Sequence, residues 1–130
     1  MVNAIAVIVA GIVSYIIGGL WHGPLFGATW MKMMGYTKAS MKKMPMTAGQ
    51  AMTIGFFVTM LLSYVIANFV QGLTLAQAMQ TTIWIWLGFE IPIIIGGWLW
   101  EGKSFKLFLF NAVYRLVEIA VIAAIVAWWM

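Results

Sequence analysis

The sequence predicts an all-α integral membrane protein, a bundle of four membrane-spanning helices. The first observation is composition: 65% of the 130 residues are hydrophobic and 8% are charged, whereas a soluble domain carries about 25% charged residues. The second is that four apolar runs are each long enough to cross a bilayer core of about 30 Å. The third is that every lysine falls in one of two short segments between these runs. Lipid is therefore the expected solvent.

The four runs form a single transmembrane domain (1–130), with spans expected at about residues 2–20, 51–70, 81–100 and 107–129. Each has the roughly 20 apolar residues that a spanning helix needs at a rise of 1.5 Å per residue. The run 2–20 has no basic residues before it and no cleavage site followed by a polar chain. It is therefore expected to be a retained helix and not a signal peptide.

The first connection, about residues 21–50, is long, whereas the third is a tight turn. Residues 28–34 mix Trp and Met with one lysine, which predicts a short helix lying at the headgroup level and ended by Gly35. Thr47 is expected to cap the second span and Ser104 the fourth, because hydroxyl side chains satisfy free amides at helix starts.

Lysine placement predicts the topology. The first and third connections hold all six lysines, while the second connection (71–80) has no charged residue. Short cytoplasmic loops collect Lys and Arg, so we expect both termini outside the cell membrane and both lysine segments inside. An interfacial position near the lysine segments is expected for Trp21, His22, Pro24 and Trp30.

The ends of the first and third spans resemble each other. Ile16-Ile17-Gly18-Gly19 and Ile94-Ile95-Gly96-Gly97 are both followed by Leu-Trp, a polar residue and Gly when one residue is inserted. Two helical hairpins repeated in parallel explain this pattern, and so does chance in a chain rich in Gly, Trp and Ile. Because glycine lets membrane helices approach closely, Gly18, Gly19, Gly96 and Gly97 are expected to face other helices.

Several motifs are shared with a known family. Residues 21–27 read Trp-x-x-Pro-Leu-Phe-Gly, 86–89 read Trp-Leu-Gly-Phe, and 101–111 read Glu-Gly-x-x-x-Lys-Leu-Phe-Leu-x-Asn. In this order and spacing they resemble the small prokaryotic membrane proteins of the domain of unknown function 1761 family. The resemblance implies a four-span fold and no established activity, and it supplies no catalytic residues. The chain departs from the family pattern at Glu90, Arg115 and Glu118, where less polar residues are usual.

Those three residues are also the charges expected inside the membrane, near mid-depth. Arg115 and Glu118 are three residues apart on one helix face, and the third and fourth spans are expected to pack antiparallel. We therefore expect a cluster in which Arg115 bridges two carboxylates. A structural ion network, a proton or ion relay, and a metal or ligand role all remain open. Pro92 is expected to kink or curve the third span beside Glu90.

Metal and cofactor sites are not predicted. The chain has no cysteine, and its one histidine, His22, cannot form a three-ligand site alone. A structural or interfacial His22 is expected, the alternative being a metal ligand shared across an oligomer. Methionines crowd the first connection, at Met31, Met33, Met34, Met41, Met44 and Met46. Thioethers suit Cu(I), but methionine also fills apolar interfaces, so lipid or protein contact is expected.

The expected function is that of a structural or accessory membrane subunit, because the chain is small and contains no set of residues typical of an enzyme. Its partners would be the lipid bilayer and either further copies or the subunits of a larger complex, and not nucleic acid. The alternative is an oligomeric minimal transporter or channel that uses the mid-membrane carboxylates.

Overall fold

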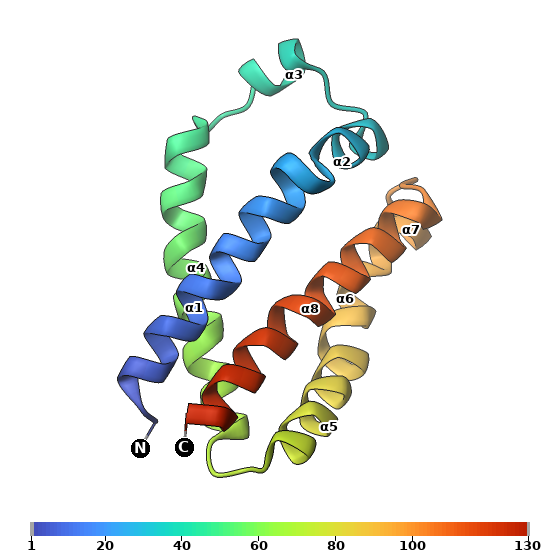
Figure 1. The fold of residues 1–130 in the computed structure, drawn as a ribbon. Helices are drawn as coiled ribbons and strands as arrows, with labels where there is room; N and C mark the ends of the chain where they lie inside the picture. Colours follow the sequence, from blue (N-terminus) through green and yellow to red (C-terminus); the bar gives the residue numbers. More distant parts are fainter. Residues whose placement is uncertain (1, 130) are drawn as a thin grey trace.

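The structure, a computed structural model, describes residues 2–129. Within these residues all regular structure is helical, and four helical stretches are long and apolar enough to cross a membrane. They are Ala4–Leu25, Ala48–Val70, Leu75–Trp100 and Phe105–Trp129. The predicted all-α four-span bundle is therefore confirmed (Figure 1).

Two of the four spans are single helices and two are divided. The first span consists of α1 (Ala4–Leu20) and the π-helical segment η1 (Trp21–Leu25). The first connection contains α2 (Gly27–Met34) and α3 (Lys38–Lys42), and the second span is α4 (Ala48–Val70). The third span is divided into α5 (Leu75–Ile85), the π-helical segment η2 (Trp86–Glu90), α6 (Ile91–Ile94) and α7 (Gly96–Trp100). The fourth span is α8 (Phe105–Trp129).

Local sequence signals determine several helix ends as expected. Thr47 caps α4 in a reciprocal pair with Gln50, in which each side chain accepts from the other residue's backbone amide. Ser104 Oγ accepts from the amide of Leu107 at 3.1 Å at the start of α8. Gly35 ends α2 in the left-handed conformation, with φ 74°, which glycine adopts without steric cost.

Two span boundaries differ from the prediction. The third span begins at Leu75, before residue 81, because Thr74 and Gln77 form another reciprocal cap and the polar residues that follow continue the helix. The first span continues past residue 20 as η1, and Gly23 interrupts it with φ −112° and ψ −107°. The start of α5 was missed because the spans were located by their hydropathy, and a helix start that is capped by polar side chains does not appear as an apolar residue run.

The third span is broken where Pro92 was expected to bend it. Proline has no amide hydrogen, so it cannot donate to the carbonyl of Gly88. The amide of Ile91 instead bonds the carbonyl of Trp86, five residues back, and this wider turn forms η2. The predicted duplication of two hairpins stays a prediction, and the two π-helical segments lie at different depths in their spans.

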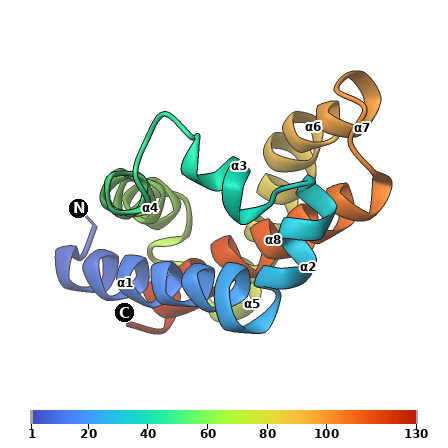
Figure 2. The same ribbon diagram turned by 90° about the horizontal axis from the view of Figure 1, so that it is seen from above.

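Both ends of the chain and the α4–α5 turn lie at one end of the bundle, which we call the terminal end (Figure 1). Helices α2 and α3 and the turn between α7 and α8 lie at the other end, which carries all the lysines and which we call the lysine end. Helix α8 contacts α1, α4 and α5 and lies between the first and third spans (Figure 2).

The core lies near the terminal end. There Ala6 and Ala10 of α1 and Ala67 of α4 belong to one buried cluster, and each is at most 1% exposed. Small residues let the two helices approach closely, and the hydroxyl of Ser63 donates to the carbonyl of Val7 at 2.7 Å. By contrast η1, α2 and α3 contain no buried residue. The bundle is therefore closed at its terminal end and loosely packed at its lysine end.

Candidate functional site

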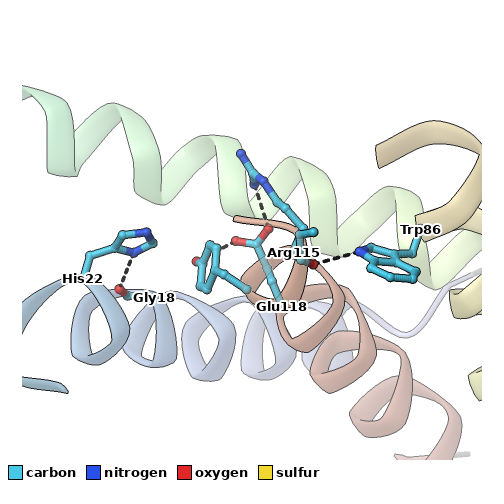
Figure 3. Close-up of polar contacts among 7 residues, drawn as sticks. Gly18, His22, Trp86, Arg115 and Glu118 are labelled. Atoms are coloured by element: carbon cyan, nitrogen blue, oxygen red, sulfur yellow. Dashed lines mark hydrogen bonds and ion pairs between the residues drawn. The ribbon is translucent and has the colours of Figure 1, made fainter. Parts of the chain in front are cut away.

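A buried carboxylate lies at the centre of α8. Glu118 is 5% exposed and accepts two hydrogen bonds, one on each oxygen. Arg115 Nη1 donates to Oε1 and the hydroxyl of Tyr114 donates to Oε2, both at 2.9 Å. The three residues lie three and four positions apart, so one helix face presents all of them. We call them the Glu118 site (Figure 3).

The Glu118 site lies near mid-membrane. Glu118 is 13 residues after Phe105 and 11 before Trp129 (118 − 105 and 129 − 118), the first and last residues of α8. At 1.5 Å per residue these offsets are about 20 Å and 17 Å along the helix. A carboxylate at this depth is costly unless it is paired, which explains why both of its oxygens are bonded within the chain.

Tyr114 links the Glu118 site to the first span. Its hydroxyl lies against Gly18 of α1, where an added Cβ would overlap it. The ring of His22 meets the ring of Tyr114 edge to face, with centroids 4.6 Å apart. His22 Nδ1 lies 3.0 Å from the carbonyl of Gly18, and because a carbonyl only accepts, Nδ1 carries the hydrogen. His22 is therefore positioned by its own helix and by Tyr114.

Aromatic rings surround this junction at the end of α1. Trp21 packs against Phe26, Phe110 and Tyr114, with ring centroids 4.8 to 5.7 Å apart. Its Nε1 is buried without a hydrogen-bond partner. Trp21 is half-buried and packs against α8 at the end of the first span, and its expected place in an interfacial belt stays a prediction.

The other interfacial predictions fall in the same region. Pro24 is exposed within η1. Trp30 of α2 is half-buried and packs edge to face on His22 at 5.5 Å and on Tyr36 at 5.6 Å. His22 and Trp30 thus join η1 to α2, and they form a structural contact within the chain.

The third span is attached to α8 by a tryptophan. Trp86, the first residue of η2, donates its indole hydrogen to the carbonyl of Ala112 at 2.8 Å (Figure 3). Sequence reasoning named Trp86 and Tyr114 only among the residues shared with the family and gave neither of them a role. The i, i+4 spacing of Tyr114 and Glu118 was the signal for the tyrosine, whereas no local pattern indicates that an indole will reach a carbonyl 26 positions away.

The predicted cluster needs a correction at Glu90. Arg115 and Glu118 meet as expected, but Glu90 forms no ion pair with Arg115. Glu90 is the last residue of η2. A π-helical turn holds more residues than an α-turn, so residues within and after it, Glu90 among them, point in directions that a straight helix does not predict.

One side of the Glu118 site is open. The side chain of Glu118 is 6% exposed, but that of Arg115 is 44% exposed and extends away from α1 (Figure 3). Asn111 lies one turn before Arg115 on the same helix face and is half-buried. A face of α8 is thus accessible, with a guanidinium near mid-depth at Arg115 and an amide one turn nearer the lysine end at Asn111.

The four predicted packing glycines behave differently. Within the chain, Gly18 closely approaches Tyr114 of α8, and a Cβ added at Gly97 would lie 3.3 Å from the side chain of Lys103, in the turn after α7. A Cβ at Gly19 or Gly96 would meet no other residue within 4 Å. In the single chain these two do not face another helix; Gly19 follows Gly18 directly and therefore points about 100° away from it around α1.

Among residues 2–129, no group of three or more His, Asp or Glu side chains is arranged to hold a metal ion. Three of the first-connection methionines, Met41, Met44 and Met46, do line one pocket, together with Lys42.

Comparison with known proteins gives one match. The family described as "Protein of unknown function (DUF1761)" matches residues 5–127, nearly the whole chain. No curated protein and no solved structure matches the chain. All but the outermost residues of the four spans, the motif residues at the end of the first span and the Glu-Gly turn before α8 fall within the matched range, and the chain belongs to this family of unknown function.

Proposed function

We propose that the chain is a non-catalytic membrane subunit that assembles, with further copies or with another protein, through the face of α8 that carries Arg115. One observation carries the proposal: the Arg115 side chain is 44% exposed at mid-depth while its carboxylate partner is 6% exposed. An arginine at the centre of a spanning helix costs about 2.5–3.5 kcal/mol when it faces lipid. A partner that covers the guanidinium removes that cost.

The large apolar surface of the third span supports assembly. Only 6% of its most apolar 18 residues are buried in the single chain, and Trp84 and Ile93 are 74% and 75% exposed. Lipid alone can cover such residues, so they enlarge a protein contact but do not determine which partner binds. The polar face of α8 supplies the specificity, because Asn111 and Arg115 have hydrogen-bond donors that lipid tails do not satisfy.

We also propose that the protein lies in the cell membrane with its termini outside and its lysine end in the cytoplasm. All six lysines gather at one end of the bundle, and short cytoplasmic segments are enriched in Lys and Arg.

Photo-crosslinking in native membranes tests the assembly. A photoactivatable amino acid at position 111 is expected to yield a covalent product heavier than the single chain, because this position shares the face of Arg115. Position 113 is the matched control, since Val113 lies on the same helix two residues away and is 48% exposed. Equal heavy products from both positions, or none from position 111, would contradict the proposal.

A second function, an oligomeric minimal transporter, is favoured by the break in the third span. Because Pro92 has no amide hydrogen, the carbonyl of Gly88 lacks its α-helical donor, and Gly88 lies two residues before Glu90 at mid-depth. Freed carbonyls beside carboxylates are a known means of coordinating ions in transporters. Ion flux in proteoliposomes that disappears in Glu90→Gln, with unchanged helical content, would support this function.

A further inference from the structure

The loosely packed lysine end contains a large pocket at the level where a membrane surface would lie. The pocket has a volume of about 720 Å³ and lies between α2, α3 and the start of α4, within the range of about 300–1,000 Å³ typical of ligand sites. Trp30, Met41, Met44 and Met46 form apolar walls, and Lys42 also lines it. We call it the interfacial pocket.

A second, smaller pocket lies nearer to mid-membrane. It has a volume of about 280 Å³ and is lined by Tyr15 and Gly18 of α1, Gly55 and Thr59 of α4, and Tyr114 of α8. We call it the narrow pocket. Helices α1 and α4 diverge toward the lysine end (Figure 1, Figure 2), and the two pockets lie along this divergence.

Helix α4 connects the two pockets. Ala51 lines the interfacial pocket and its neighbour Met52 lines the narrow pocket. Gly55 and Thr59 follow at one-turn intervals, so one face of α4 borders both spaces. At Gly55 an added Cβ would lie 3.8 Å from Tyr15, an ordinary contact distance. A larger side chain there would fill the narrow pocket.

The charge around the interfacial pocket is positive. The first acidic residue of the chain is Glu90, so the first connection holds four lysines and no acid. The pocket thus joins an apolar wall of flexible thioethers, which adapt to irregular apolar shapes, to a basic side chain. Cu(I) fits these surroundings poorly, because thioethers are neutral and Lys42 would repel the ion.

We propose that an anionic phospholipid binds in these two pockets. Its phosphate lies beside Lys42 in the interfacial pocket, and one acyl chain follows α4 into the narrow pocket. An anionic headgroup complements the lysines, and an acyl chain complements the apolar walls. A free phosphate ion would satisfy only Lys42.

Native mass spectrometry of the purified protein tests this proposal, with phosphatidylglycerol as the anionic probe and phosphatidylcholine as the neutral one. Wild-type protein is expected to retain phosphatidylglycerol preferentially. In Lys42→Gln its retention is expected to fall about five-fold, as for the loss of one lysine near an anionic surface. The matched control is Lys43→Gln, because Lys43 is the adjacent exposed lysine and does not line the pocket.

A second pair of variants tests the acyl chain. Gly55→Leu is expected to reduce retention of both lipids, whereas Gly49→Leu, in the first turn of the same helix and outside both pockets, is expected to leave it unchanged. Equal losses in Lys42→Gln and Lys43→Gln, equal retention of the two lipids, or full retention in Gly55→Leu would each overturn the proposal. One Cu(I) ion per chain that is lost in Met44→Leu would overturn it too, and would assign the pocket to a metal.

Discussion

Replacing Arg115 by leucine removes the cation that pairs with Glu118 and leaves a buried carboxylate with one hydrogen bond, from Tyr114. Stranding one charge of a fully buried pair costs about 3–5 kcal/mol. The lower end applies here because the Arg115 side chain is 44% exposed. The wild-type protein already bears the cost of exposing this arginine to lipid, and its removal in the variant offsets part of the loss. We expect the free energy of unfolding to fall by about 3 kcal/mol, which corresponds to a more than hundred-fold change in the unfolding equilibrium constant.

Unfolding in mixed micelles, followed by tryptophan fluorescence and by far-UV circular dichroism, measures this loss. The double variant Arg115→Leu, Glu118→Gln strands no charge and keeps an acceptor for the Tyr114 hydroxyl. It is expected to regain stability to within about 1 kcal/mol of wild type, because replacing both members of a pair is far less costly than replacing one. Val113→Leu, an exposed position on the same helix, is the control. A loss below about 1 kcal/mol in Arg115→Leu, or a double variant less stable than the single one, would refute the assigned pairing.

Three further outcomes are expected. Ser63→Ala should lower the free energy of unfolding by about 0.6 kcal/mol, the average for a hydrogen bond between membrane helices, and an unchanged unfolding midpoint would show that its bond to Val7 contributes nothing. Gly18→Val should lower thermal stability, because the new side chain overlaps Tyr114, while Gly19→Val should leave it unchanged; the opposite order would refute the placement of α1 on α8. A cysteine in place of Lys38, in this naturally cysteine-free chain, should resist an impermeant thiol reagent applied outside intact cells, and labelling there would reverse the proposed orientation.

Most of the fold follows from patterns that are local in the sequence. Hydropathy predicts four spans, and single residues predict helix ends at Gly35, Thr47 and Ser104, as the structure confirms. The early start of α5 was missed because polar side chains form its cap, and hydropathy counts these residues as loop.

The candidate site was less predictable because it depends on the phase of helices relative to one another. Arg115 and Glu118 lie on one helix, so their spacing alone brings them together. The direction of Glu90 depends on a π-helical turn, and the contact of Tyr114 with Gly18 depends on how α1 crosses α8. The sequence analysis also missed the packing at the terminal end through Ala6, Ala10 and Ala67. Alanines are common throughout the chain, and the glycine pairs predicted close packing at the other end.

The mass of the purified protein in a mild detergent tests the central claim, assembly through the Arg115 face, most directly. Wild-type protein is expected as two or more chains per particle, or in a fixed ratio with another membrane protein, and the variant Arg115→Leu, Glu118→Gln as single chains of unchanged helical content. The proposal would be contradicted if wild-type protein is monomeric and free of partners in detergent and if crosslinking in native membranes also yields only single chains.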